Sequence, residues 1–361
     1  MLAERISNLY QDPGPFASVF VDVSRGTASG EHEVELKVRK AAERLSEEGA
    51  PKEVVQAVSD RLGASNGVPA PASQVVVATE RGVLLDDIVH TASERSTATW
   101  GVLPDISEWI GCEDAVVAFV LALVDHEGGE VVTYGTNNTD GATTVDESSE
   151  HENKVRGGGL AHKRYQRVAE NVWAENAEAV ADVIRSRISD GLRLVLLAGD
   201  PNSRSKVRTA LDAPPAVEIV QLAHGGRSED RGDEALHNAI GEVLAEHSTA
   251  TRLRLVHDLK DRLGAGNGAI TGVRDVADAF VRGQVATLLI DPAEAAQNVL
   301  DSREHPGLAL SEMPTNEPVR ADLGLVAAAA RTGADVVVTP AGTLYGTSVA
   351  ALLRWEGAES T

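Results

Sequence analysis

Apolar and polar positions in the first third of the chain predict a small domain built from strands and helices. Runs rich in Val, Ile and Phe, bounded by turn residues, are typical of strands, and charged stretches with apolar residues three to four positions apart are typical of helices. The strands are expected at Phe16–Val23, Gln74–Thr79 and Gly82–Val89, and the helices at Glu31–Glu48 and Lys52–Leu62. We therefore expect an α+β domain over residues 1–112.

The middle third opens with a hairpin pattern. The continuous apolar run Ala115–Val124 suits a buried strand, Asp125–Glu130 is the turn, and Val131–Tyr134 returns. A polar stretch, 135–159, precedes a long helical pattern at Ala161–Ser189. A strand, a helix and a strand are then expected at Leu192–Ala198, Asn202–Leu211 and Val217–Leu222. This alternation predicts a domain over residues 113–247 in which helices pack on a sheet.

Alternating helices and strands continue to the end of the chain, after a helix-rich connection. We expect helices at Val273–Arg282 and Leu323–Thr332, strands at Val285–Ile290 and Asp335–Thr339, and a closing strand or short helix at Ser348–Trp355. Asp301–Arg320 is rich in Pro, Glu and Ser, which is typical of a mobile loop. The pattern predicts an α/β domain over residues 248–361.

Composition narrows the class of protein. The chain has 361 residues, enough for two or three domains, and only 3% are aromatic, so the cores must be built from Val, Leu, Ile and Ala. No run approaches the roughly 18 to 20 apolar residues that cross a bilayer, and the first residues lack the pattern of a signal peptide. Cys112 is the single cysteine, which excludes an intramolecular disulfide. We expect a cytoplasmic protein without membrane contact or cofactor.

The net charge of −22 argues against non-specific binding to nucleic acid or membranes. At physiological ionic strength, however, the Debye length is only about 8 Å, so distant acidic surfaces are screened and a local patch decides any RNA contact.

One such patch is the segment Lys154–Arg167, which has five Lys or Arg residues and no acid. Its three consecutive glycines allow close approach of the backbone to a partner, and cations beside them can pair with phosphates. A flexible loop that caps a helix and carries solvated cations explains the same residues. The candidate RNA-binding residues are Lys154, Arg156, Gly157, Gly158, Gly159, His162, Lys163, Arg164 and Arg167.

The order of these motifs resembles the archaeo-eukaryotic release factor and Pelota family, in its bacterial branch. In that family a glycine-rich loop carrying Gly-Gly-Gln precedes a helix marked Arg-Phe-x-Arg. Here Arg164-Tyr165-Gln166-Arg167 matches the helix mark and Gly158-Gly159 matches the glycine pair. Leu192–Pro201 resembles the strand and turn that follow.

The last third is similar to the family's third domain, which has the fold of kink-turn-binding ribosomal proteins. Arg282–Ile290, Val336–Val338 and Gly346–Trp355 carry that likeness. The resemblance covers about Glu113–Trp355 and implies a three-domain, α/β architecture with a mixed-sheet central domain. The N-terminal domain matches by position alone.

A departure from the family pattern bears on activity. With Gly158 and Gly159 as the glycine pair, Leu160 stands where the family has glutamine. A hydrolase must position water and stabilise the oxyanion formed at the peptidyl-tRNA ester, so the loss predicts a non-hydrolytic relative. The backbone N–H at that position survives, which leaves weak hydrolysis open as an alternative.

Within the family, the resemblance is to Balon-like hibernation factors. It implies binding to ribosomal RNA in the A site of idle ribosomes, with elongation factor Tu as partner. Ribosome rescue or peptide release by an altered loop is one alternative, and a protein-interaction scaffold that never touches RNA is another.

Other candidate residues have weaker patterns. Arg25 lies in a loop that suits either the decoding centre or a plain strand-to-helix connection. Asp86 and Asp87 favour a solvated turn over an acid pair, because neighbours on a strand point to opposite faces. The histidines at 224, 237, 247 and 257 lack metal-type spacing, and Ser203 is explained by helix capping. The stretch 264–268 is glycine-rich but follows no strand, so we expect a linker.

Overall fold

The computed structural model describes most of the chain, and its described residues form two compact units. These residues are 2–24, 30–64, 71–89, 91, 96–113, 117–125, 127–134, 143–146, 160–223, 233–311 and 317–355. Unit 1 combines Met1–Ala115 with Arg252–Thr361, and unit 2 is Val116–Thr251. Both units are mixed α/β, which confirms the predicted fold class.

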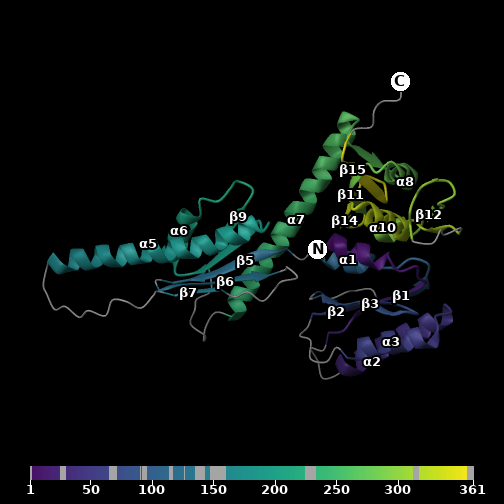
Figure 1. Cartoon of the computed structure of the whole chain (residues 1–361), viewed down its shortest axis with the longest axis horizontal. Coiled ribbons are helices and arrows are strands. Elements are labelled where there is room, and N and C mark those ends of the chain that lie inside the picture. Colours follow the sequence, from purple (N-terminus) through teal and green to yellow (C-terminus); the bar gives the residue numbers. More distant parts are fainter. Residues whose placement is uncertain are drawn as a thin grey trace. The chain divides into compact units, whose positions relative to one another are not determined.

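The N-terminal part of unit 1 is a four-stranded antiparallel sheet in the order β3-β2-β1-β4. Its strands are β1 (Phe16–Asp22), β2 (Ser73–Thr79), β3 (Gly82–Val89) and β4 (Thr97–Gly101). Helices α2 (Gly30–Glu47) and α3 (Lys52–Gly63) cover one face, and α1 (Leu2–Leu9) lies on the other (Figure 1). Cover on both faces explains why β2 is buried at every position, as its run of valines predicts.

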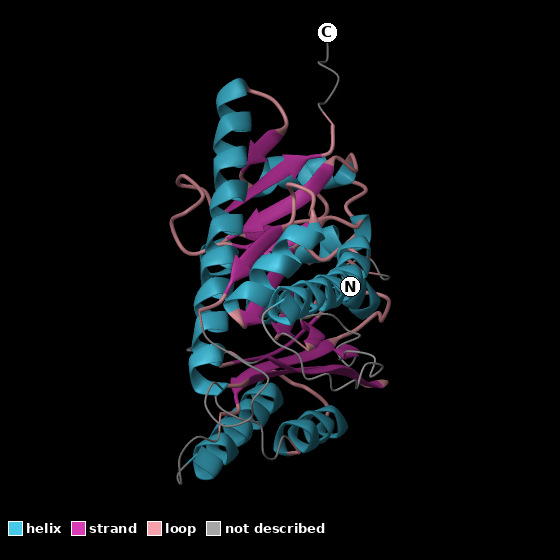
Figure 2. Ribbon diagram, turned by 90° about the vertical axis from the view of Figure 1, so that its left-hand side faces the viewer, coloured by secondary structure: helices cyan, strands magenta, loops and turns pink. Residues whose placement is uncertain are grey.

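The C-terminal part of unit 1 is a second four-stranded sheet, in the order β10-β15-β11-β14. Its strands are β10 (Ala269–Thr271), β11 (Val285–Ile290), β14 (Asp335–Val338) and β15 (Val349–Leu353). Helices α8 (Val273–Val281) and α10 (Ala321–Thr332) pack on one face, and the end of α7 (Asp233–Ala265) packs on the other. In Figure 2, α7 is the long helix that runs beside these strands. The closing segment of the chain is thus a strand, one of its two expected forms.

The two sheets of unit 1 share one hydrophobic core. Phe16 and Phe20 of β1 belong to the same buried cluster as Leu288 of β11 and Leu325 of α10. Trp109, fully buried on α4 (Ser107–Glu113), is also part of this cluster. The predicted domain boundaries at residues 112 and 247 stay a prediction. The shared core shows that residues 1–112 and 248–361 pack together.

Unit 2 is a five-stranded mixed sheet in the order β7-β6-β5-β8-β9. Its strands are β5 (Phe119–Val124), β6 (Gly128–Tyr134), β7 (Thr143–Asp146), β8 (Leu194–Gly199) and β9 (Glu218–Gln221). The strands β7, β6 and β5 pair antiparallel, whereas β8 pairs parallel with both β5 and β9. Helices α5 (Leu160–Ser189) and α6 (Pro201–Leu211) pack on one face and α7 on the other. The mixed sheet and both helices match the expectation for this block.

The stretch Asp301–Arg320 differs from the expected loop. Its described parts, 301–311 and 317–320, contain buried residues and a short strand, β13 (Val319–Arg320), paired with β12 (Val299–Leu300). His305 is 5% exposed and its Nδ1 lies 2.6 Å from Asp278 Oδ1. Leu310 is buried in the shared core. The expectation of a mobile loop is wrong for these parts. It rested on their content of Pro and Glu, which does not indicate the buried residues that fix them.

The longest helices, α5 and α7, have 30 and 33 residues and carry charges along their length. Among the helices of the described ranges, none has an apolar stretch long enough to span a membrane.

Candidate functional site

The predicted RNA-binding segment, 154–167, follows β7 in the chain and ends in the first turns of α5. Residues 147–159, which include Lys154, Arg156 and the three glycines at 157–159, lie outside the described residues, and so does Arg25. His162, Lys163, Arg164 and Arg167 belong to the first turns of α5, whose backbone is described and whose side chains there are not. The roles of these residues therefore stay predictions.

The elements that bound this segment are fixed in unit 2. The second half of α5 is anchored in the core, with Val180, Ala181 and Ile184 all at most 1% exposed. At the other end, β7 pairs with β6, and Arg187 Nη2 of α5 donates to Thr143 Oγ1 of β7 at 3.3 Å. β7 before the segment and the second half of α5 after it thus belong to one packed unit, an arrangement in which a loop can be presented to a partner.

The start of α5 is unusual in its charge. Its first turn contains no acidic residue, and the sequence places His162, Lys163 and Arg164 there. Cations at a helix N-terminus oppose the helix dipole by about 0.3–1 kcal/mol each. Helix stability therefore does not account for these residues.

The strand and turn after α5 have a geometric requirement for glycine. Gly199 ends β8 with φ +109°, and a Cβ built on it would lie 2.0 Å from Val124 O. Asp200 N donates to the same carbonyl at 2.9 Å, and the Asp200 side chain caps α6 by accepting from Ser203 N at 2.9 Å. Ser203 is thus part of a helix cap, as the sequence predicts.

A polar cluster in unit 1 is the feature that sequence reasoning missed. Arg320 donates from Nη1 to Asp105 Oδ2 at 3.0 Å, and from Nε and Nη2 to the two carboxylate oxygens of Asp322 at 3.1 and 2.5 Å. Asp322 is fully buried and Asp105 is 8% exposed. The buried Tyr10 hydroxyl has no hydrogen-bond partner among the described residues. The cluster, which we call the Arg320 cluster, joins the loop between β4 and α4 to β13 and the start of α10.

Burial raises the pKa of two groups at the Arg320 cluster. It raises the pKa of Asp105, and the nearby Asp322 charge adds to this, while Arg320 opposes it. It also raises the pKa of Tyr10 far above the ordinary range, with the charges of Asp105 and Asp322 contributing. For Arg320, burial alone would lower the pKa, but its hydrogen bonds and ion pairs with the two carboxylates raise it. The guanidinium stays charged and compensates the buried carboxylates.

Replacing Asp105 with Asn is expected to change how stability depends on pH. Because the folded-state pKa of Asp105 is raised, its stabilising contribution is complete below the unfolded-state pKa of about 3.9 and is lost as the pH rises through the folded-state value. Asp105→Asn lacks this loss. Its free energy of unfolding should therefore increase relative to that of the native chain from about pH 4 upward, as measured by urea denaturation. A difference between the two proteins that is constant with pH would contradict the raised pKa.

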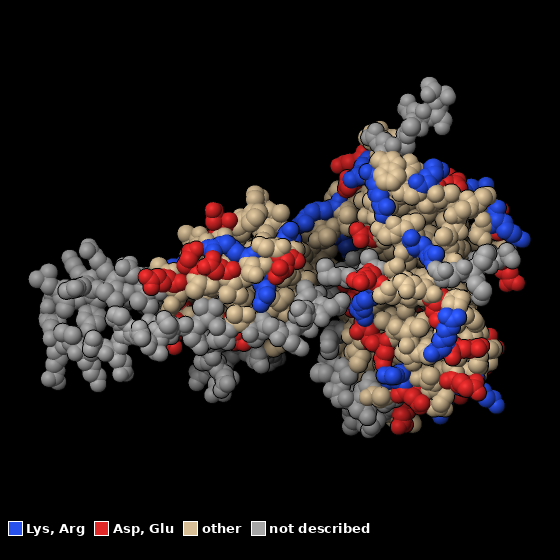
Figure 3. Space-filling view, viewed as in Figure 1, with Lys and Arg blue, Asp and Glu red and all other residues tan. Residues whose placement is uncertain are grey.

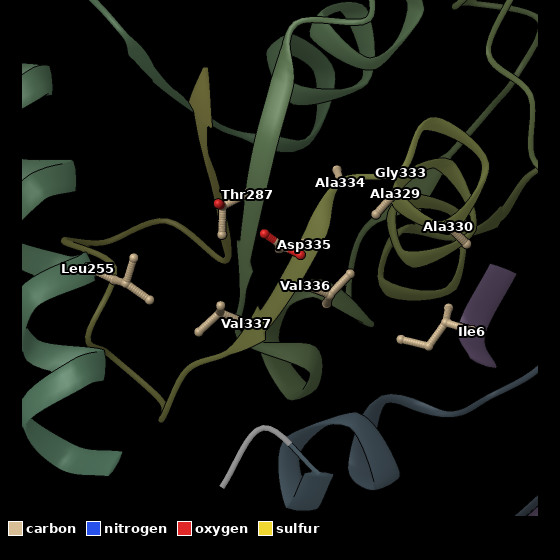
Figure 4. Close-up of a pocket in the computed structure, with 10 residues that line it drawn as sticks. All are labelled: Ile6, Leu255, Thr287, Ala329, Ala330, Gly333, Ala334, Asp335, Val336 and Val337. Carbon is tan, nitrogen blue, oxygen red and sulfur yellow. The ribbon is translucent and has the colours of Figure 1, made fainter. Parts of the chain in front are cut away.

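An apolar pocket of about 260 Å³ also lies in unit 1 (Figure 4). It surrounds the outer edge of β14, between Leu255 of α7 and Ile6 of α1. Its polar side chains are those of Asp335 and Thr287, and the other lining residues are aliphatic or glycine. The lining is thus mainly apolar, and the pocket fits an apolar group.

Asp86 and Asp87 depart from the sequence prediction. They lie within β3 rather than in a solvated turn, and each has its own partners. Asp86 Oδ1 accepts from Gln74 Nε2 at 2.7 Å, whereas Asp87 Oδ2 accepts from Arg5 Nη2 at 2.7 Å and from Trp109 Nε1 at 3.0 Å. The expectation that they point to opposite faces holds, and the buried partners on each face explain their place in a strand.

Other candidate residues have structural roles where they are described. His247 Nδ1 lies 2.7 Å from Glu218 Oε2, and His257 Nδ1 lies 2.9 Å from Leu253 O. Burial raises the pKa of Cys112, which makes its thiol a poor nucleophile. Within the described part of the chain, no three or more His, Cys, Asp or Glu residues are grouped so that they could hold a metal ion.

Charged side chains of both signs are mixed over the described surface seen in Figure 3. The described part of α5 in unit 2 carries several acidic residues. Among them are Glu178 and Asp182, which both pair with Arg185. The segment 154–167 therefore differs in charge from the second half of α5: the segment has cations and no acid, whereas the second half of α5 carries acids.

Comparison with protein families gives a match to the middle of the chain. Residues 118–265 match the family described as bacterial archaeo-eukaryotic release factor family 2. The matched range includes the whole segment 154–167 and all of unit 2 from Ala118 onward. This part of the chain is release-factor-like.

Two sequence relatives come from Mycobacterium tuberculosis: uncharacterized protein Rv2629 of strain H37Rv and uncharacterized protein MT2704 of strain CDC 1551. Each is 26% identical to this chain over 348 residues, which cover 93% of this chain and 92% of the relative. The relatives thus extend over nearly the full length of the chain.

Similar solved structures include an archaeal translation termination factor and Pelota proteins. The archaeal translation termination factor aRF1 is 17% identical with a TM-score of 0.24, covering 98% of this chain and 96% of that one. Archaeoglobus fulgidus Pelota is 14% identical with a TM-score of 0.35, covering 78% and 79%. Ribosome-bound archaeal Pelota, solved with ABCE1, is 15% identical with a TM-score of 0.41, covering 99% and 95%.

Proposed function

We propose that the protein is a ribosome-binding translation factor that occupies the A site of idle ribosomes, as a hibernation factor of the Balon type. The observation that carries this proposal is the place of the cationic, glycine-rich segment 154–167 inside the residues that match a release-factor family. Five cations in 14 residues supply the attraction to phosphates that dominates binding to nucleic acid. The segment is flanked by β7 and by α5, whose second half is packed in the core of unit 2.

The segment is expected to contact ribosomal RNA near the peptidyl-transferase centre. Gly157, Gly158 and Gly159 let the backbone pass close to RNA. Lys154, Arg156, Lys163, Arg164 and Arg167 pair with phosphates, and His162 stacks on or hydrogen-bonds to a base. Arg25 is proposed to lie at the decoding centre, and elongation factor Tu is the proposed partner.

We infer that the factor does not cleave peptidyl-tRNA, because no glutamine stands at the position of Leu160 or Gly159. A catalyst of ester hydrolysis must hold a water and stabilise the oxyanion, and leucine or glycine offers no side-chain hydrogen bond for that water. Rescue or peptide release is the second candidate function, and it is favoured by the backbone N–H that remains at this position as an oxyanion donor.

Co-sedimentation with purified vacant ribosomes at low ionic strength tests the proposal. The native chain is expected in the ribosomal pellet. The double variant Gly158→Ala with Gly159→Ala should be depleted from it, because a Cβ at each position restricts the backbone and the close approach to RNA. Gly241→Ala is the matched control, since an added Cβ on this exposed residue of α7 meets no atom within 4 Å.

The same preparation separates the two candidate functions. Ribosomes loaded with a labelled peptidyl-tRNA should release no more peptide with the factor than with buffer. Release that depends on Gly158 and Gly159 would make the protein a hydrolase, and absence of the native chain from the pellet would contradict both ribosomal functions.

A further inference from the structure

Three helix-to-strand connections meet the exit of β15 at one end of the C-terminal sheet. Strands β10, β11 and β14 start at this end, and the antiparallel β15 ends there. Main-chain hydrogen bonds tie these parts together, because Leu353 N donates to Gly268 O at 2.9 Å and Arg354 N donates to Gln284 O at 2.8 Å. We call the surface formed here by residues 264–268, Arg282, Arg354 and Trp355 the Trp355 surface.

Two arginines of this surface are held in place by neutral groups. Arg282 Nε donates to Gln284 Oε1 at 2.6 Å. Arg354 Nη2 donates to the carbonyl oxygens of Thr332 and Gly333 at 3.0 and 2.8 Å. Within the described residues, neither guanidinium has a carboxylate partner. Neutral partners orient a guanidinium and leave its charge and its other N–H groups available for an anion such as a phosphate.

The exposed charges at this end of the sheet are more often positive than negative. Among the described residues of the helix ends and strand ends here, four exposed cations accompany two exposed carboxylates: Lys260, Arg282, Arg331, Arg354, Asp261 and Asp335. The partly buried Arg262 is paired with Asp258 at 2.9 Å. The local balance is therefore positive, although the whole chain carries a net charge of −22, and acids more than about 8 Å away are screened at physiological ionic strength.

An aromatic ring lies beside these cations. Trp355 directly follows Arg354 and is 52% exposed. Tryptophan is highly buried on average, so a ring with half of its surface in contact with solvent needs a reason. A base can stack on such a ring without a surrounding pocket, whereas the apolar anchor of a protein partner fills a pocket.

The glycine-rich stretch 264–268, expected from sequence to be a linker, is the short connection from α7 to β10. Gly264 and Gly266 are exposed, and a Cβ built on either residue meets no atom within 4 Å. The space over this connection is therefore open. Because glycine has no side chain, the backbone of a ligand can approach it closely.

From these observations we propose that the Trp355 surface binds a single-stranded segment of RNA. A base stacks on the Trp355 indole, Arg282 and Arg354 pair with phosphates beside it, and the glycine-rich connection leaves room for the sugar–phosphate backbone. Stacking combined with phosphate pairing is typical of proteins that bind single strands without sequence preference. The surface belongs to unit 1, so it is a second RNA contact, separate from the segment 154–167, and it does not depend on the proposed ribosomal function.

The test uses the full-length chain with the five cations of the segment 154–167 replaced by alanine, so that this segment cannot account for binding. A fluorescein-labelled decauridylate is the probe, because its length lies within the roughly 4–16 nucleotides that single-strand sites cover. Fluorescence anisotropy at about 0.1 M salt, where the Debye length is about 10 Å, should detect binding. Trp355→Ala should weaken binding by about fivefold or more, whereas Trp355→Tyr, which keeps a ring, should stay within about threefold.

Two pairs of variants test the charges and the open connection. Replacing Arg282 and Arg354 with glutamine should reduce the slope of log affinity against log salt by about 1.4. The same change at Arg39 and Lys40, exposed cations of α2, should leave it unchanged. Gly264→Glu adds a carboxylate at the surface without a clash and should weaken binding by about fivefold, whereas Gly241→Glu, on the same helix and equally open, should not.

Loss of the folded thermal transition in the arginine variant would leave Trp355→Ala and Gly264→Glu as the deciding variants. The proposal is overturned if the chain without the segment cations does not bind the RNA, if Trp355→Ala binds it as before, or if both glutamate variants weaken binding equally. An oligoglutamate peptide that displaces the RNA at an equal concentration would assign the surface to an acidic protein instead. No ribosome is used, so failure here and failure of the proposed ribosomal function are distinguishable.

Discussion

Replacing Lys163, Arg164 and Arg167 together with alanine should reduce the slope of log affinity against log salt for ribosome binding by about 2, from about −3.5 for the five cations of the native segment. Each cation that pairs with a phosphate releases a counterion, and the coefficient for single-stranded nucleic acid is about 0.7 per contact. Affinity should fall most at low salt, where counterion release contributes most. Binding curves at four or more salt concentrations give the slope.

The matched control for this experiment removes three cations that lie outside the segment 154–167. Arg39, Lys40 and Lys52 are exposed residues of α2 and α3, and their replacement with alanine changes the net charge by the same amount. Their loss should leave the slope unchanged. Equal slopes for the native chain and the segment variant would remove the segment from the interface.

Arg320→Ala should destabilise unit 1 by about 3 kcal/mol, the lower end of the range for breaking a buried ion pair. The variant leaves Asp322, which is fully buried, and Asp105, which is 8% exposed, without their shared cation. The lower end applies because the Arg320 side chain is itself 42% exposed, so water can partly replace it. Urea denaturation followed by tryptophan fluorescence measures the change, since buried Trp109 reports on unit 1.

Two further variants make this prediction specific to the cluster. Arg39→Ala removes an exposed ion pair with Glu43 and should change stability by less than about 0.5 kcal/mol. Adding Asp105→Asn to Arg320→Ala removes one of the uncompensated carboxylates, so the double variant should be more stable than Arg320→Ala alone. If Asp105→Asn changed stability by the same amount in the Arg320→Ala background as in the native chain, the pairing described for Arg320 would be wrong.

Much of the secondary structure follows from local pattern. The continuous apolar runs of β2 and β8 are strands because both faces of their sheets are covered. The helical period of α5 holds in the described half of the helix, where Val180 and Ile184 are buried. These elements are stabilised by burial of the residues that create the pattern, so the pattern predicts them.

Elements stabilised by distant partners escaped prediction. β7 lies in a polar stretch and is a strand because it pairs with β6. α1 has eight residues, too few for a reliable period, and is stabilised by burial of Ile6 and Leu9 in the shared core. β4 owes its place to pairing with β1, about 80 residues earlier in the chain.

The candidate sites divide in the same way. The RNA-binding segment is local, because its cations and glycines are contiguous, and it could be proposed from sequence alone. The Arg320 cluster could not, since Arg320 and Asp105 are 215 positions apart and nothing near either residue indicates the other.

The most direct test of the central claim is a density map of the protein bound to purified vacant ribosomes. If the protein is an A-site factor, the chain will lie in the A site. Residues 154–167 will lie against ribosomal RNA at the peptidyl-transferase centre, and the N-terminal sheet will face the decoding centre. A map in which the chain binds elsewhere, or in which this segment faces solvent, would contradict it.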